Sequence, residues 1–316
     1  MTRAQQDNDI EQCESELIER DSTVINHLRR PLTPWLTVDR AIPQRTLRMV
    51  GPWCFVDHFG PVAAADYQAF DVAPHPHIGL QTITWLFSGQ LLHLDSLGNE
   101  QPLRAGELNV MTAGKGISHA EVADVQNQAP LHGLQLWSAL PLKQEQCEPA
   151  FEHHRQCPLF SINGTMATLL VGHYENYRSP ASCYHPQIAM TLTSQQPQTS
   201  KLHLKPEFEY ALVVCQGRIY VDGKAVNAQQ TVALGSSRSS VHIEFSTDTR
   251  ALLIGGEPFP QPVTMWWNFV SQKVERLAQA AKDWQQHQPR FGNVRGYQGT
   301  RIEGPEFPNN LKQQGD

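Results

Sequence analysis

The sequence predicts an all-β protein made of two related barrels in tandem, with one helix near the C-terminal end. From Leu47 onward, short runs rich in β-branched and aromatic residues alternate with turns of Gly, Asn, Asp and Ser. The clearest example is the run Gln81–Phe87, which is followed by Ser88-Gly89 and then by Leu91–Leu94. Strands spaced about every 8 to 12 residues are typical of a β-sandwich or barrel. No helical pattern separates these strands, which argues against a parallel sheet with crossover helices.

A second segment repeats this order of strands and turns, which indicates an internal duplication. The strand–turn–strand order of Phe208–Val221 matches that of Leu80–Leu94. Three prolines predict a linker near residues 140–160. The expected organisation is a polar N-terminal segment over 1–24, a first barrel over 25–145, a second barrel with the helix over 146–290, and an irregular tail over 291–316.

One helix is expected at the end of the second barrel. Apolar residues there recur at three- and four-residue spacing, which places them on one stripe of a helix. These residues are Val270, Val274, Leu277, Ala281 and Trp284. A single stripe without a basic face predicts packing against a barrel rather than on a membrane.

The composition narrows the class of protein. The 316 residues include 25 Lys and Arg against 31 Asp and Glu, a net charge of -6, which disfavours direct binding to nucleic acid. The six cysteines are scattered, so no disulfide framework is expected. We find no signal-peptide pattern and no apolar run long enough to span a membrane, so we expect a cytoplasmic protein.

Two pairs of polar residues carry the candidate chemistry. His75 and His77 are separated by one residue, and so are His119 and Glu121. On a strand such residues point to the same face, whereas on a helix they diverge by about 200°. A proline before each histidine of the first pair excludes a helix interior and favours a sheet edge or barrel rim. The second pair follows a glycine-marked turn at 114–116.

If the strands carrying these pairs line one barrel, three imidazoles and one carboxylate converge. This set of donors suits Fe(II), Mn, Ni, Cu or Zn and is too rich in nitrogen for Mg or Ca. With four protein ligands, a six-coordinate ion keeps positions open for water, substrate or dioxygen, whereas structural zinc sites are usually closed and contain cysteine. The sequence therefore predicts an open metal site in the first barrel, with His75, His77, His119 and Glu121 as ligands.

Four segments, taken in order, resemble the pirin family. They are Met49–Pro61, Pro74–Gly79, Thr112–Glu121 and Gly255–Val270, within a similarity that extends from about residue 25 to about 285. Pirins are bicupins, so the resemblance implies two cupin barrels, which are double-stranded β-helices of the jelly-roll type. It also implies iron bound by the four residues above and a second cupin that has lost its metal. Some pirins resemble quercetin 2,3-dioxygenases in activity, and others act as transcriptional coregulators.

One position departs from the cupin pattern. Cupins, and many pirins, have a glutamate a few residues after the first histidine pair, and here that residue is Gln81. The match is weakened little, because pirins take their carboxylate ligand from the second pair. The change does remove one candidate base beside the metal.

The second barrel is expected to bind no metal. Alignment of the two barrels places His203 and Lys205 on the first histidine pair, and His242 and Glu244 on the second pair. Lys205 puts a cation where an imidazole would have to bind. Apolar residues alternate with His242 and Glu244, so these two side chains should face outward.

These features predict an iron(II)-dependent dioxygenase of the quercetin 2,3-dioxygenase type, which binds a flavonol or similar small aromatic substrate and O2. Glu121 is both a ligand and the candidate catalytic base, because a carboxylate beside the metal can accept the substrate's hydroxyl proton. His93 and Asp95 either support the ligands or belong to a solvated strand face. The candidate pocket residues are Phe55, His58, Phe59, Met111 and Trp137.

Two alternatives use the same ligands. The first is a non-enzymatic, metal-dependent transcriptional coregulator that acts through a protein partner. The second is another metal-dependent reaction, such as an isomerisation, on an unrelated small molecule. The residues alone do not separate these functions, because one ligand set serves all of them.

Overall fold

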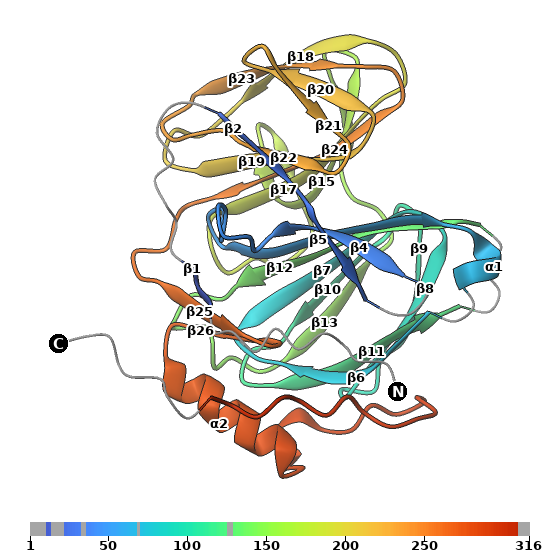
Figure 1. The fold of residues 1–316 in the computed structure, drawn as a ribbon, viewed down its shortest axis with the longest axis vertical. Helices are drawn as coiled ribbons and strands as arrows, with labels where there is room; N and C mark the ends of the chain where they lie inside the picture. The colour runs from blue at the N-terminus through green and yellow to red at the C-terminus, as the bar shows by residue number, and fades with distance from the viewer. Residues whose placement is uncertain (1–10, 14–21, 33–35, 68–69, 125–128, 309–316) are drawn as a thin grey trace.

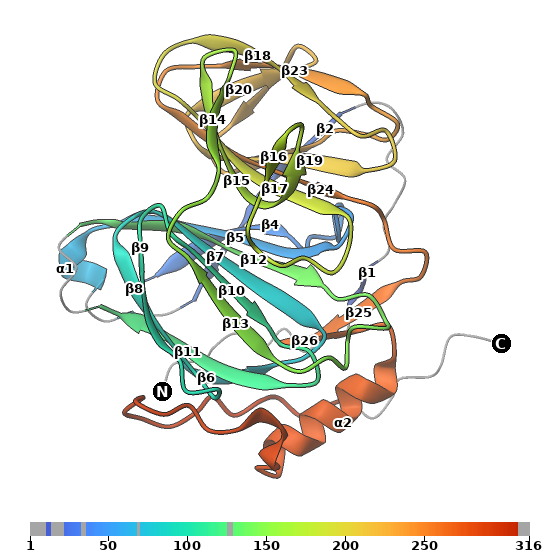
Figure 2. The ribbon, with the colours of Figure 1, turned by 180° about the vertical axis from the view of Figure 1, so that it is seen from behind.

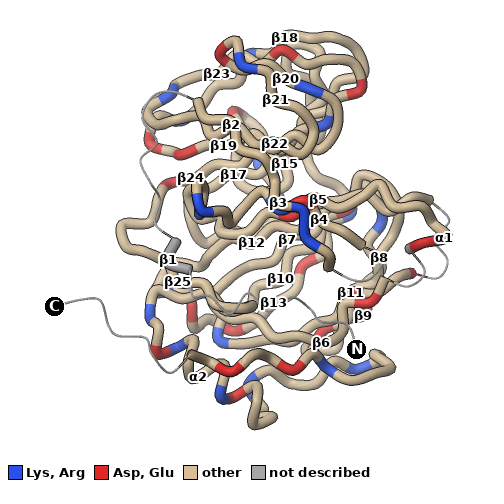
Figure 3. The backbone as a smooth tube through the Cα atoms, viewed as in Figure 1, with Lys and Arg blue, Asp and Glu red and all other residues tan. Residues whose placement is uncertain are grey.

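The computed structural model describes residues 11–13, 22–32, 36–67, 70–124 and 129–308. Two barrels lie one above the other, and a helix and a long C-terminal segment run along the far end of the first barrel (Figure 1). Basic and acidic residues are interspersed along both barrels (Figure 3). Most of the predicted N-terminal segment, residues 1–10 and 14–21, lies outside the described residues.

The first barrel consists of a seven-stranded and a four-stranded antiparallel sheet. In pairing order, the larger sheet contains β13 (Ala150–His154), β10 (Leu108–Thr112), β7 (Leu80–Ser88), β12 (Leu131–Ala139), β5 (Trp53–Val62), β4 (Thr37–Ile42) and β3 (Leu28–Pro31). The smaller sheet contains β6 (Asp71–His77), β11 (Ile117–Ala123), β8 (Gln90–Asp95) and β9 (Glu100–Arg104). The short helix α1 (Ala64–Tyr67) follows β5.

The second barrel has the same two-sheet design. Its eight-stranded sheet contains β14 (Leu159–Ile162), β15 (Thr165–Tyr174), β17 (Gln187–Ser194), β24 (Thr249–Gly256), β19 (Glu209–Gln216), β22 (Gln230–Ala233) and β2 (Thr23–Asn26), with β16 (Tyr177–Arg178) paired to β15. Its smaller sheet contains β18 (Gln198–His203), β23 (Ser240–Phe245), β20 (Arg218–Val221) and β21 (Lys224–Asn227). A separate sheet is formed by β1 (Glu11–Cys13), β25 (Val263–Trp266) and β26 (Phe269–Ser271).

The predicted duplication corresponds to two matching strand–turn–strand units, β7–β8 and β19–β20, in which the chain passes from the larger sheet of its barrel to the smaller one. They turn at Gly89 and Gly217, whose φ angles are 83° and 76°. Both angles lie in the left-handed region that glycine adopts without steric cost, which explains why glycine recurs at this point of the repeat. The prediction of an all-β fold with two barrels is confirmed.

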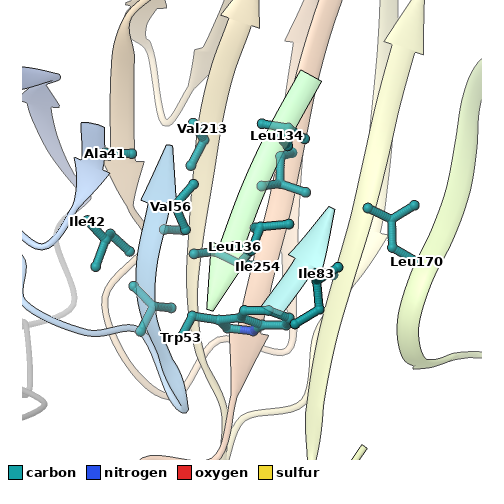
Figure 4. Packing of buried hydrophobic residues seen from close by; sticks show 14 of the residues in the cluster. Ala41, Ile42, Trp53, Val56, Ile83, Leu134, Leu136, Leu170, Val213 and Ile254 are labelled. Atoms are coloured by element: carbon teal, nitrogen blue, oxygen red, sulfur yellow. The ribbon is translucent and has the colours of Figure 1, made fainter. Parts of the chain in front are cut away.

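The barrels pack against each other through an apolar core. Trp53, Val56 and Leu136 of the first barrel contact Val213 and Ile254 of the second in one buried cluster (Figure 4). The indole nitrogen of Trp53 also donates a 3.0 Å hydrogen bond across this interface to a backbone carbonyl of β24. Burial of such large side chains at about 25 cal/mol per Å² makes the interface a substantial part of the stability of the molecule.

Segments from both ends of the chain cross between the barrels. β2 pairs with β22 of the second barrel, and β13, which follows the predicted boundary at 145, pairs with β10 of the first barrel (Figure 2). The helix α2 (Val274–Gln285), which was assigned to the second domain, lies beside β26 and β6 at the end of the first barrel (Figure 1). β13 and α2 therefore lie on the first barrel, although they follow the boundary expected at residue 145, and β2 pairs with the second barrel.

The helix α2 matches the predicted stripe, except at its start. Leu277, Ala281 and Trp284 are buried on one face. Val270 instead belongs to β26, so the helix begins four residues later than the spacing suggests. A short 3-10 helix (Pro289–Phe291) follows, and the described residues after it form an irregular segment, as predicted. Neither α1 nor α2 is long and apolar enough to cross a membrane.

Candidate metal centre

The two predicted pairs of polar residues lie on neighbouring strands. β6 carries His75 and His77, and β11 carries His119 and Glu121. His119 is directly opposite His75 in the antiparallel register. β6 is an edge strand of its sheet, as the prolines beside its histidines predict. All four side chains line the same cavity.

The three imidazoles form a compact cluster. One nitrogen from each of His75, His77 and His119 lies within 4.8 Å of the other two, and the ring centroids are 4.4 to 5.0 Å apart. The β6–β11 register shifts between His119 and Glu121, and Glu121 groups within 4.8 Å of His119 and His93. The four predicted ligands thus occur as two overlapping groups that share His119.

Backbone carbonyls fix two of the imidazoles in one tautomer. Nδ1 of His75 lies 2.9 Å from the carbonyl oxygen of Ala73, and Nδ1 of His77 lies 3.0 Å from that of Asn268. A carbonyl oxygen only accepts hydrogen bonds, so each Nδ1 carries the proton and each Nε2 presents a lone pair. Nε2 of His77 faces Nε2 of His119 at 3.1 Å. Converging lone pairs of this kind fit a divalent cation.

Burial sets the protonation of the cluster. It lowers the pKa of His75 to about 4 and lowers the pKa values of His77 and His119 well below their usual range. The three rings are therefore neutral at neutral pH, which is the form of imidazole that binds a metal. Burial also raises the pKa of Glu121, which makes this carboxylate a stronger base.

A cavity of about 230 Å³ opens beside the cluster. One wall is a stack in which the rings of Phe55 and Trp137 lie 4.0 Å apart and the Arg40 guanidinium lies 4.4 Å from the Phe55 centroid. Asp57 accepts two 2.9 Å hydrogen bonds from Arg40. The Trp137 ring lies 5.0 Å from the ring of His77. The flat wall therefore ends at the imidazole cluster.

Three of the five predicted pocket residues line this cavity, namely the two phenylalanines and Trp137. The predictions for His58 and Met111 are wrong. His58 follows Asp57 on β5 and so points to the opposite face, where its Nε2 lies 2.8 Å from Nε2 of His132. Met111 is buried in the same apolar cluster as Phe55 and Trp137, but it does not line the cavity.

Some cavity residues were missed although a signal for them existed. Asp57 and Gln135 lie two residues before Phe59 and Trp137 on the same strands. Since strand side chains alternate between faces, extending the predicted residues by two positions would have found both.

Other cavity residues come from the C-terminal segment, where no local pattern pointed to the site. Trp267 and Asn268, in the β25–β26 turn, line the cavity together with Ile302. The backbone N–H of Ile302 donates a 2.8 Å hydrogen bond to the carbonyl of Pro74, the residue before His75. Trp267 and Asn268 do lie within one of the segments that resemble pirins, so the resemblance was the available hint.

The residue that departs from the cupin pattern has a structural role. Gln81 is buried, and its side-chain amide donates hydrogen bonds to Thr112 at 3.0 Å and to the carbonyl of Ser182 at 3.2 Å. It therefore links β7 to β10 and to the segment that precedes β17.

In the second barrel the corresponding residues face solvent. His242 and Glu244 are exposed on β23, whereas the apolar residues that alternate with them are buried, which confirms the predicted orientation. His203 and Lys205 are exposed as well. His203 pairs at 2.9 Å with Glu175, and the buried residues of this barrel form an apolar cluster.

Two family models match the chain. The model described as Pirin matches residues 36–138, and the model described as Pirin C-terminal cupin domain matches residues 189–292. A protein named putative quercetin 2,3-dioxygenase from Pseudomonas aeruginosa is 40% identical over 273 residues, which cover 86% of each chain. A pirin-like protein from Caulobacter vibrioides is 35% identical over 254 residues, which cover 78% of this chain and 87% of the relative.

Solved structures show the same architecture. A quercetin 2,3-dioxygenase from Acinetobacter baumannii superimposes with a TM-score of 0.88 at 39% identity, covering 92% of this chain and 97% of that one. A bacterial pirin from Escherichia coli, solved in complex with nickel(II), shares the fold at 18% identity, with a TM-score of 0.61 and coverage of 76% and 100%. These likenesses confirm the prediction of tandem cupin barrels.

Proposed function

Because the chain belongs to the pirin family, we propose that it is a metal-dependent dioxygenase of the quercetin 2,3-dioxygenase type. Its substrate would be a flavonol or a similar small aromatic compound with an acidic hydroxyl, cleaved with O2. The observation that carries the proposal is a cluster of three neutral imidazoles and one carboxylate on the wall of an aromatic cavity. The names of the relatives from P. aeruginosa and A. baumannii support the same reaction class.

His75, His77, His119 and Glu121 would hold the ion. Iron(II) is the first candidate, and Mn, Ni, Cu and Zn suit the same donors. A bound iron(II) ion would supply the Lewis acidity and redox capacity that ring cleavage with dioxygen requires. The backbone carbonyls at Nδ1 of the first two histidines keep both rings oriented, which lowers the cost of assembling the site.

The cavity would bind the flat substrate along its aromatic wall. Phe55 and Trp137 present stacked faces, and aromatic faces of this kind bind a planar ring. Arg40 is fixed by Asp57 at the far end of the stack and would orient electron-rich oxygens of the substrate. Trp267 also lines the cavity and helps exclude water from the reacting oxygen.

Glu121 would accept the proton of the substrate hydroxyl. Its Oε1 lies 3.3 Å from Oγ1 of Thr84, whose proton stabilises the ionised carboxylate. The same hydroxyl lies 2.9 Å from Oε1 of Gln135. Since a hydroxyl has one proton, Thr84 can donate to Gln135 once Glu121 has become protonated. Thr84 therefore donates to Glu121 when the carboxylate is ionised and to Gln135 when Glu121 is protonated.

Oxygen uptake tests the proposal. Iron-loaded protein is incubated with a panel of flavonols with and without air, and oxygen consumption and substrate loss are followed together. We expect uptake with wild type and with the control His203→Ala, and none with His119→Ala. Metal-loaded wild type that turns over no flavonol would contradict the proposal. Selective capture of a protein partner by that inert protein would favour the coregulator alternative.

A further inference from the structure

β8 carries a polar pair that the proposed function leaves unused. His93 and Asp95 lie directly opposite Glu121 and His119 in the β8–β11 register. Directly opposed residues of antiparallel strands project to the same side of the sheet. Three adjacent strands, β6, β11 and β8, therefore each bring one polar pair to the same region.

Asp95 is held rigidly. It has no exposed surface, and Oδ1 accepts hydrogen bonds from the backbone N–H groups of Leu97 at 2.9 Å and Asn99 at 3.0 Å. The side-chain amide of Asn99 also donates to both carboxylate oxygens, at 3.0 and 2.8 Å. Three donors from one tight turn fix the direction in which Oδ2 points.

That oxygen in turn fixes His93. Nε2 of His93 lies 3.1 Å from Oδ2 of Asp95, and the imidazole stacks on Phe151 at 4.4 Å and 16°. Only 5% of the His93 surface is exposed. Because a carboxylate only accepts, Nε2 carries the proton of this hydrogen bond, and Nδ1 is the ring nitrogen that the bond to Asp95 does not use.

The dyad has the form that supports metal-binding histidines. Such histidines usually donate their second N–H to a carboxylate or a backbone carbonyl. His93 has this support, whereas Nδ1 of His119 makes no hydrogen bond within the part of the chain that the structure describes. A ligand-type atom of His93 also lies within 4.8 Å of those of His119 and Glu121.

We propose that His93, held by Asp95, is an additional metal-binding residue that shares the ion with His119 and can substitute for Glu121. This inference rests on the proposed metal site. It resolves a conflict within that site, since Glu121 has to serve both as a ligand and as a base. When His93 binds the ion, the Glu121 carboxylate can contact the substrate while the protein keeps the metal.

A double-mutant cycle on metal affinity tests the substitution without any measurement of activity. Affinity for iron(II), and for nickel(II) as an air-stable probe, is measured by chelator competition for wild type, Glu121→Gln, His93→Gln and the double variant. If the two residues substitute for each other, each single change weakens binding by about tenfold and the double change by about 10³-fold or more. Independent roles would give a product of about 10²-fold.

Two controls separate the possible failures. His203→Gln makes the same change at an exposed histidine of the second barrel and should leave affinity unaltered. Thermal unfolding of the metal-free variants shows that each is folded. A wild type that binds neither metal would overturn the proposed function itself. A wild type that binds one ion, with effects that multiply in the double variant, would overturn the role of His93 alone.

Discussion

Replacement of Glu145 tests how the C-terminal segment is held against the first barrel. Its carboxylate is 1% exposed and accepts hydrogen bonds from Oγ of Ser271 at 2.7 Å, from the backbone N–H of Gln272 at 2.7 Å and from Nη1 of Arg276 at 2.5 Å. The three donors lie between the end of β26 and the first turn of α2, so this one acceptor holds the start of the helix.

Glu145→Gln keeps the size of the side chain but removes its charge and turns an N–H group toward one of the donors. A hydrogen bond to a charged group contributes about 1.5–3 kcal/mol, and a buried donor left without a partner costs about 1–3 kcal/mol. Arg276 is 26% exposed, so water replaces part of the hydrogen bonding that its guanidinium loses. We expect the free energy of unfolding to fall by about 3 kcal/mol. At about 2 °C per kcal/mol for a chain of this size, Tm falls by about 6 °C.

Calorimetric unfolding of the metal-free protein measures this change. The matched control is Glu148→Gln, because Glu148 is 78% exposed and its ion pair with Lys115 lies at the surface. Exposed ion pairs contribute at most about 1 kcal/mol. Since Asn268, which orients His77, lies three residues before Ser271, metal affinity should fall for Glu145→Gln as well. Equal Tm values for the two variants would refute the anchoring role.

Three further predictions follow from the site and the burial of its residues. At matched metal occupancy, Glu121→Gln should retain metal but turn over substrate about 10²-fold more slowly. His119→Ala should lose metal and activity together. A rate near wild type for Glu121→Gln would exclude Glu121 as the base. Burial lowers the pKa of His58 to about 3 and of His132 to about 4. As pH falls from 6.5 toward 4, the unfolded chain therefore takes up protons that the folded chain does not, and the urea midpoint of unfolding should fall. A midpoint that is unchanged between pH 7 and pH 5 would contradict this. The five cysteines whose side chains are described form no disulfide with one another. Titration of denatured, unreduced protein should find close to six thiols, and a clear deficit would be the contrary result.

Local patterns predicted most of the β-structure and the core of the site. The β-branched and aromatic run Gln81–Phe87 and the turn glycine Gly89 form a strand and a turn that are decided by residues close in sequence. The same holds for the spacing of His75 with His77 and of His119 with Glu121, because a one-residue interval on a strand fixes a shared face whatever the rest of the fold does. The resemblance to pirins identified the two barrels as cupins and implied that the first, not the second, binds the metal.

What the sequence could not predict depends on contacts between distant segments. β2 joins the second barrel and α2 returns to the first, and no pattern within 23–26 or 274–285 names the partner of either segment. His58 was predicted to line the pocket because it lies in a segment on the metal side, but strand alternation places it on the opposite face from Phe59. That His93 lies close to Glu121 follows from the register between β8 and β11. The local sequence of these two strands does not specify that register.

The central claim, one metal ion held by the first barrel, is tested most directly by metal content with positional evidence. Protein loaded with iron(II) or nickel(II) is analysed for metal per chain, and crystals are measured at the absorption edge of the bound metal. We predict one ion per chain, with its anomalous peak among His75, His77 and His119, and loss of that ion in a His75→Ala, His77→Ala variant. Two tightly bound ions, or a peak beside His203 and His242 in the second barrel, would contradict the account.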